Sequence, residues 1–238
     1  MRPYYLDVLE KRVTGKDLLR ELFRRAKARL LPAPKADRQY WTPADVIDAD
    51  GPELGLRCYL EHRDLRAVIA EIPAERRKTG VEIGCGYGRL TVVLQEFFAR
   101  TVGIEREEGL LRIARVLTPQ IEYVLTPSLS QLAALTGPVD FAMIFTVLTH
   151  MTDAQAQEVL AAMKQKVGRG WILIVEHTDP AERTGDTSDC AQFMVQGRPV
   201  AVFEEWMKPF KLVKTLSRTI EPTYVRKDVG QYMLFLNS

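Results

Sequence analysis

Cysteine and histidine are scarce in this sequence, and no apolar run is long enough to cross a membrane. The three cysteines, Cys58, Cys85 and Cys190, lie far apart, which excludes a disulfide framework and a clustered metal motif. The N-terminus lacks the long apolar core of a signal peptide, and the apolar runs at 142–148 and 171–175 are too short for a transmembrane helix. We therefore expect a cytoplasmic protein whose thiols stay reduced.

The chain as a whole also lacks an excess of one charge sign, because its formal net charge is only +2. Residues 1–38 are nevertheless basic, with eleven Lys or Arg against five Asp or Glu, whereas the other 200 residues contain 22 against 26. Within this basic part, the spacing of apolar residues predicts an amphipathic helix over 16–31 that Pro32 ends. Such a helix packs on the rest of the chain or on a second subunit; the alternatives are a substrate lid, a membrane-surface contact and a polyanion-binding arm.

From about residue 80, short apolar runs alternate with helical segments, which predicts a mainly parallel sheet covered by helices on both faces. The expected strands are 79–84, 100–105, 121–125, 139–145 and 171–176. Capping-box patterns predict helices that begin at Ser128 and Thr152. Two further β segments, at 211–220 and 230–236, are too close together for a crossover helix between them, so they should pair antiparallel.

The segment 81–89 reads Val-Glu-Ile-Gly-Cys-Gly-Tyr-Gly-Arg, an apolar run followed by three alternating glycines. Glycine at 84, 86 and 88 permits positive φ and lets a ligand approach the main chain. A helix that begins after Gly88 would direct its N-terminal N–H groups at a negatively charged ligand group. The spacing Glu-x-Gly-x-Gly-x-Gly differs from the Gly-x-Gly-x-x-Gly of dinucleotide sites, which disfavours a nicotinamide-dependent oxidoreductase.

Glu105 ends the second predicted strand, 21 positions after Gly84. An acidic side chain at this point is placed to accept hydrogen bonds from both hydroxyls of a bound ribose. The alternative is a solvated carboxylate at a strand end, because further charged residues follow it. The position of Glu105 favours the ribose contact.

The glycine motif, Glu105 and the segment from Asp140 to His150 together resemble the class I S-adenosylmethionine-dependent methyltransferases. The resemblance implies an α/β fold with a doubly wound seven-stranded sheet, mostly parallel with an antiparallel C-terminal strand, and a helical N-terminal extension. It implies a division into residues 1–60, the extension that serves as a lid, substrate contact or oligomer contact, and 61–238, the S-adenosylmethionine-binding domain. The implied cofactor is S-adenosyl-L-methionine, and the product is S-adenosyl-L-homocysteine.

The resemblance also places residues of three loops around the cofactor. It assigns Glu105 to the ribose, Ser128 to the adenine, where many members have an Asp, and Phe145 with Thr146 to the methionine part. Ser128 equally fits a helix N-cap, and the two roles are compatible. The full predicted set is Glu82, Gly84, Cys85, Gly86, Gly88, Glu105, Arg106, Ser128, Leu129, Phe145 and Thr146.

Two of the three histidines, His150 and His177, follow the fourth and fifth predicted strands, where open α/β sheets bind their ligands. Methyl transfer needs an acceptor held in line with the methyl carbon, and a hydroxyl acceptor must also lose a proton. A neutral imidazole suits that step, so both histidines are candidate catalytic residues; the alternative for each is a hydrogen-bonded loop anchor. Glu176 and Asp179 flank His177, but the fourth strand ends without the Asp of magnesium-dependent members, and we expect no metal.

These features predict a methyltransferase acting on an O or N atom of a small-molecule or glycan acceptor, with the loop-rich segment 178–202 as part of the acceptor site. The alternatives are an RNA or protein methyltransferase that uses the basic arm, and a non-catalytic binding protein with the same fold. No Asn-Pro-Pro-Tyr-like motif follows the fourth strand and the arm has few aromatic residues, which argues against a nucleic-acid partner. Peripheral membrane contact through the helix at 16–31 and oligomer formation remain open.

Overall fold

The computed structural model describes residues 54–132, 135–181, 183–184, 195–218 and 230–238, of which 54–57 and 183–184 are described by their backbone alone. The predicted basic helix at 16–31 and most of the predicted extension 1–60 lie outside these residues. None of the helices in the described ranges has the length and apolar character that a membrane crossing requires.

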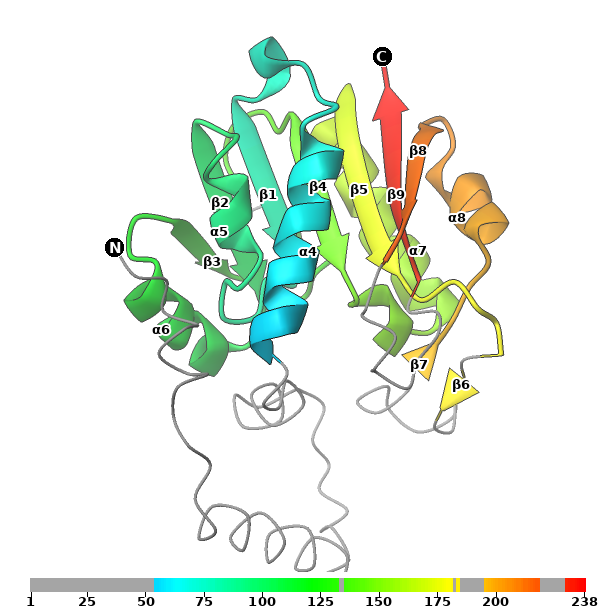
Figure 1. Cartoon of the computed structure of the whole chain (residues 1–238), viewed down its shortest axis with the longest axis horizontal. Coiled ribbons are helices and arrows are strands. Elements are labelled where there is room, and N and C mark those ends of the chain that lie inside the picture. The colour runs from blue at the N-terminus through cyan, green and yellow to red at the C-terminus, as the bar shows by residue number, and fades with distance from the viewer. Residues whose placement is uncertain (1–53, 133–134, 182, 185–194, 219–229) are drawn as a thin grey trace, which may run out of the picture. The chain divides into compact units, whose positions relative to one another are not determined.

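Seven strands form one sheet in the order β3-β2-β1-β4-β5-β9-β8 (Figure 1). Their bounds are Thr79–Ile83 for β1, Arg100–Glu105 for β2, Glu122–Leu125 for β3, Phe141–Phe145 for β4, Gly170–Glu176 for β5, Lys211–Ser217 for β8 and Gln231–Asn237 for β9. Strands β1 to β5 are parallel, and β9 runs antiparallel to both β5 and β8. This confirms the predicted doubly wound sheet. Its strand order reverses between β1 and β4, where open α/β sheets bind their ligands.

Helices cover both faces of the sheet, and Figure 1 shows α4 and α5 in front of it and α7 behind it. The helix bounds are Leu54–Ile69 for α4, Thr91–Leu94 for α5, Glu108–Leu117 for α6, Asp153–Val167 for α7 and Val200–Met207 for α8. All five residues of β4 are buried and alternate between the two cores. Phe141, Met143 and Phe145 pack with residues of α4 and α5, whereas Ala142 and Ile144 pack with residues of α7 and α8. This alternation follows from the two-residue period of a strand and explains why β4 is apolar throughout.

The predicted start of α7 is confirmed in detail. Thr152 is the N-cap, and its hydroxyl accepts a hydrogen bond from the Gln155 N–H. The Gln155 side-chain oxygen in turn accepts from the Thr152 backbone N–H. The helix ends at Val167, and Gly168 follows with a φ of 61°. The capping box therefore fixes the point where the chain leaves the carboxyl edge of the sheet.

Two predicted helix starts are wrong. The helix expected directly after Gly88 begins only at Thr91, and residues 89 and 90 before it form a turn. Residues 128–131 form turns, and no α-helix begins at Ser128 within the described range up to residue 132. The Ser128 hydroxyl accepts from the Ser130 N–H at 3.4 Å and bonds to the Ser130 hydroxyl at 3.0 Å, so it stabilises this turn.

The segment between β5 and α8 contains two short strands, Arg183–Thr184 (β6) and Val195–Gln196 (β7), which pair antiparallel. They lie in the range 178–202, which the sequence describes only as rich in loops. Near the start of the described residues, α4 runs continuously through residue 60, the expected boundary between the N-terminal extension and the S-adenosylmethionine-binding domain.

Candidate functional site

The glycine loop that follows β1 is tied to the end of β2. The Gly84 and Cys85 N–H groups both donate to the Ile104 carbonyl, at 2.8 and 3.0 Å. Gly84 and Gly86 have φ values of 74° and 55°, a region that side chains disfavour. A Cβ at Gly84 would lie 2.7 Å from a methyl group of Val147, so packing between two loops requires this glycine.

Gly86 differs, because a Cβ added to it would meet no atom within 4 Å. Packing of the described protein therefore does not require a glycine at this position. Its N–H is held by the Glu105 carboxylate at 2.9 Å. Gly86 therefore has an open face beside the Glu105 carboxylate, and its contact with the cofactor stays a prediction.

Glu105 is almost fully buried, and its carboxylate organises this end of the sheet. Besides the Gly86 bond, one carboxylate oxygen accepts from the Arg106 and Glu107 N–H groups at 2.7 and 3.1 Å. A carboxylate has about four acceptor positions, so these three bonds leave about one position for a ribose hydroxyl, where the sequence predicts contacts with both hydroxyls. The sequence pointed to Glu105, but its bond to the glycine loop follows only from the fold.

Glu82 lies in β1 with 3% of its surface exposed and accepts a hydrogen bond from the Thr91 hydroxyl. Burial raises the pKa of Glu82 to about 8, despite the opposing effects of Thr91 and of the Arg89 charge. The carboxyl group therefore holds its proton near neutral pH in the ligand-free protein. The hydrogen bond from Thr91 links β1 to α5, and the glycine motif does not indicate Thr91 as the partner of Glu82.

The loop after β3 meets the glycine loop through Leu129. This side chain is buried, and its Cδ1 lies 3.5 Å from the Cβ position of Gly84. Ser128 next to it is half-buried and bonds to the Ser130 hydroxyl at 3.0 Å. Leu129 and Gly84 thus lie together as expected, whereas the adenine contact of Ser128 stays a prediction.

Phe145 and Thr146 mark the end of β4. Thr146 has a φ of 50°, which is unusual for a residue with a side chain, and its N–H donates to the Val175 carbonyl at 2.8 Å. Backbone in this region often accompanies functional loops. The Phe145 ring is buried, with its centroid 5.9 Å from that of Tyr232 and 5.0 Å from the guanidinium carbon of Arg218.

A buried ionic cluster that the sequence did not indicate lies beside Phe145. The Glu61 carboxylate on α4 accepts from Arg89, which follows the glycine loop, and from Arg218, which follows β8. Burial acts to raise the pKa of Glu61, but the two guanidinium charges outweigh it and hold the pKa below its ordinary value. His62 also contacts this region, since its Nε2 lies 2.9 Å from the Arg89 carbonyl.

The two candidate catalytic histidines lie at the ends of adjacent strands, as predicted. His150 ends the 3₁₀ turn Leu148–His150 after β4, and His177 directly follows β5. Both are half-buried. The structure thus brings them to the same edge as Phe145 and Thr146, and their chemical roles stay predictions.

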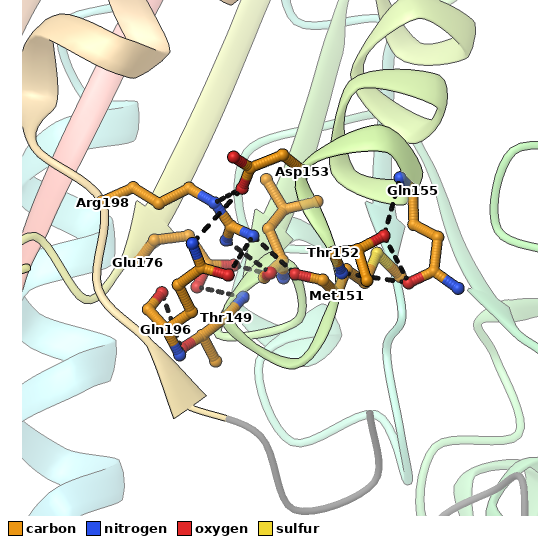
Figure 2. A network of polar contacts seen from close by, with 9 residues as sticks. Thr149, Met151, Thr152, Asp153, Gln155, Glu176, Gln196 and Arg198 are labelled. Carbon is orange, nitrogen blue, oxygen red and sulfur yellow. Dashed lines mark hydrogen bonds and ion pairs between the residues drawn. The ribbon is translucent and has the colours of Figure 1, made fainter. Parts of the chain in front are cut away.

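Glu176, for which the sequence suggested only a possible metal contact, binds backbone N–H groups. Its carboxylate accepts from three successive backbone N–H groups, those of Val147, Leu148 and Thr149, and Figure 2 shows Glu176 beside Thr149. Burial raises the pKa of Glu176 to about 7, opposed by these hydrogen bonds and by the Arg198 charge. In the described part of the chain, no three His, Cys, Asp or Glu side chains gather as a metal site would require.

A family model described as a methyltransferase domain matches residues 81–170, from the glycine loop to the start of β5. Residues 81–170 therefore match a methyltransferase domain. The site described above lies on this methyltransferase domain and on α4 and the C-terminal strands that surround it.

A trans-aconitate 2-methyltransferase from Azoarcus sp. (strain BH72) is 32% identical to this chain over 127 residues, which are 51% of this chain and 49% of the relative. The chain therefore matches about half the length of that relative. The magnesium protoporphyrin IX methyltransferase from Synechocystis PCC 6803, solved with bound S-adenosylhomocysteine, aligns with a TM-score of 0.61 at 15% identity, over 94% of this chain and 99% of that one. An S-adenosylmethionine-dependent methyltransferase from Leishmania major aligns with a TM-score of 0.62 at 17% identity, over 82% and 76%. These two likenesses concern the fold.

Proposed function

We propose that this protein is an S-adenosylmethionine-dependent methyltransferase that acts on an O or N atom of a small-molecule or glycan-type acceptor. The observation that carries the proposal is the open face of Gly86, whose N–H is fixed by the Glu105 carboxylate. The methyltransferase domain at 81–170 and the fold support it.

The predicted cofactor residues fit S-adenosylmethionine in chemistry. Glu105 offers carboxylate oxygens to the ribose hydroxyls, and Gly86 leaves room for the nucleoside. Leu129 gives an apolar surface next to Gly84 for the base, and Phe145 with Thr146 borders the methionine part. When bound, the cofactor supplies an electrophilic methyl group on a sulfonium.

The chain's remaining task is to hold the acceptor in line with that methyl group and to exclude water. For a hydroxyl acceptor, His150 or His177 would take the proton as a neutral imidazole. A carboxylate acceptor is already ionised near neutral pH and needs no base. Residues 1–60 and 178–202, which carry the least regular patterns, are proposed to supply the acceptor contacts.

The relative named trans-aconitate 2-methyltransferase suggests a polycarboxylate as the first acceptor to test. Trans-aconitate, citrate and a neutral sugar would therefore be compared with labelled methyl donor.

The proposal is tested first by calorimetric titration of the full chain with S-adenosylmethionine, S-adenosylhomocysteine and NAD. We expect binding of the first two and none of NAD. Binding of NAD alone would overturn the proposal, and binding of the first two without turnover across a broad acceptor screen would favour a non-catalytic binding protein.

A further inference from the structure

Two buried side chains of opposite charge hold the segment between β4 and α7. Glu176, at the end of β5 and 1% exposed, takes the backbone N–H groups of Val147, Leu148 and Thr149 at 2.9, 2.7 and 3.1 Å. Three successive N–H groups bound to one carboxylate fix the conformation of this turn. The left-handed Thr146 lies immediately before it.

Arg198 holds the same segment through its carbonyl groups. This side chain is 3% exposed. Its Nη1 donates to the Leu148 carbonyl at 2.8 Å and its Nη2 donates to the Met151 carbonyl, while Nε donates to Asp153 Oδ1 at 2.9 Å (Figure 2). The guanidinium carbon lies 5.5 Å from the ring centroid of Trp206. A planar guanidinium with donors in a fixed fork makes these bonds together, which a lysine ammonium at the end of a flexible chain does not.

The backbone of Arg198 reaches the second histidine. Its N–H donates to the His177 carbonyl at 3.0 Å. Two residues earlier, Gln196 pairs with Thr149 through bonds of 3.3 and 3.4 Å. The strand β7 and residue 198 are therefore attached both to the turn that carries His150 and to the residue that follows β5.

We propose that Arg198 is a positioning residue for methyl transfer, which sets the turn 147–151 and His177 so that Thr146, His150 and His177 are held relative to one another. This inference rests on the proposed function. Arg198 need not touch cofactor or acceptor, since it acts through backbone groups on either side of His150. Arg198 itself belongs to the segment 178–202, which is proposed to contact the acceptor, and its side chain ties that segment to the turn of His150.

The test compares the full chain with Arg198→Met and Arg198→Lys variants. Arg100→Met is the matched control, because Arg100 also donates to a carboxylate, that of Glu122 at 2.9 Å, and to a carbonyl, that of Thr136 at 2.7 Å, but at the opposite edge of the sheet. The readouts are the ring ¹H–¹³C NMR signals of the three histidines, the affinity for S-adenosylhomocysteine and the melting temperature. His62 on α4 serves as the internal reference.

We expect Arg198→Met to shift or broaden the His150 signal, to change His177 less because the backbone N–H of residue 198 is retained, to leave His62 unchanged and to weaken S-adenosylhomocysteine binding about tenfold. Arg198→Lys should cause smaller changes in the same histidine signals and in the affinity. Arg100→Met should change neither the signals nor the affinity. A lower melting temperature with unchanged histidine signals and unchanged affinity would reduce Arg198 to a structural residue and overturn the inference. An equal shift of all three histidines would also contradict it.

Two further results would also test the role of Arg198. If Arg198→Met does not fold, the Lys variant decides, and unchanged His150 and His177 signals in it contradict the inference. If the unmodified chain does not bind S-adenosylhomocysteine, the proposed function fails. The histidine signals of the ligand-free protein then still decide whether Arg198 holds the two histidines.

Discussion

The alternating glycines of the motif are required for different reasons, which the structure separates. Gly84 lies against Val147, and a Cβ at Gly88 would lie 2.2 Å from the Tyr123 hydroxyl, so both are packed against the protein itself. Gly86 has open space where its Cβ would be and a fixed N–H. Of these three glycines, Gly86 is the one whose Cβ position contacts none of the described residues, so packing within them does not require glycine there.

This difference predicts the effect of Gly86→Ala, with Gly168→Ala as the matched control. Both glycines have φ near +60°, and a Cβ added to either would meet no atom within 4 Å, but Gly168 ends α7 at the opposite edge of the sheet. Each substitution places a side chain at positive φ, which side chains disfavour, and should destabilise the fold. Only Gly86→Ala should weaken S-adenosylhomocysteine binding measured by calorimetry, by about tenfold, which corresponds to about 1.4 kcal/mol. Equal affinities of the two variants would contradict the assignment of Gly86.

The raised pKa of Glu82 predicts a pH-dependent stability. Its pKa is near 4.5 before folding and about 8 in the folded protein, so the folded state holds the extra proton between these values. The contribution of Glu82 is then fully present below about pH 4.5 and is lost as pH rises through about pH 8, by at most about 5 kcal/mol. Glu82→Gln removes this titration, so its stability advantage over the unmodified chain should grow between these pH values in urea unfolding. Parallel pH profiles would show that Glu82 is ionised in the fold.

At the scale of elements, the sequence located the strands better than the helix starts. Each buried strand is an apolar run with a two-residue period, a local signal that survives folding. The Ser128 pattern matched a capping box as well as the Thr152 pattern did, yet only Thr152 caps a helix. Serine and threonine hydroxyls bond to nearby backbone N–H groups in turns as well as at helix starts. At Ser128 the chain forms a turn, and the hydroxyl bonds within it.

The capping box at α7 predicts a measurable loss in one element. Thr152→Ala removes the acceptor for the Gln155 N–H and should lower the free energy of unfolding by about 1 kcal/mol. Gln165→Ala changes an exposed residue later in the same helix and should stay within about 0.5 kcal/mol of the unmodified chain. Denaturant unfolding measures both, and an equal effect would mean that the cap does not stabilise the helix.

At the scale of the molecule, the ionic cluster joins three distant segments. Glu61 pairs with Arg89, 28 positions away, and with Arg218, 157 positions away. Glu61 is 1% exposed, so the pairs lie in a low-dielectric environment where an unpaired charge is costly. The cluster links α4, the glycine loop and the end of β8.

Glu61→Gln should therefore destabilise the whole domain, by about 3 kcal/mol, because it removes a buried negative charge that binds two guanidinium groups. The control is Glu96→Gln, since Glu96 also binds an arginine, Arg66, through both carboxylate oxygens but is 44% exposed. That variant should lose less than about 1 kcal/mol. The comparison uses the free energy of unfolding in urea, and equal losses would show that burial of the cluster adds nothing.

The sequence by itself determined the sheet, the glycine loop, the Glu105 strand end and the start of α7, because these depend on residue order over short distances. Only the tertiary structure decided that Glu105 holds Gly86, that Glu61 pairs with two arginines, and that Arg198 fixes the turn before His150. Each of these contacts joins residues that are far apart in the chain. Their pairing depends on which segments the fold buries side by side, where a polar group must find a partner.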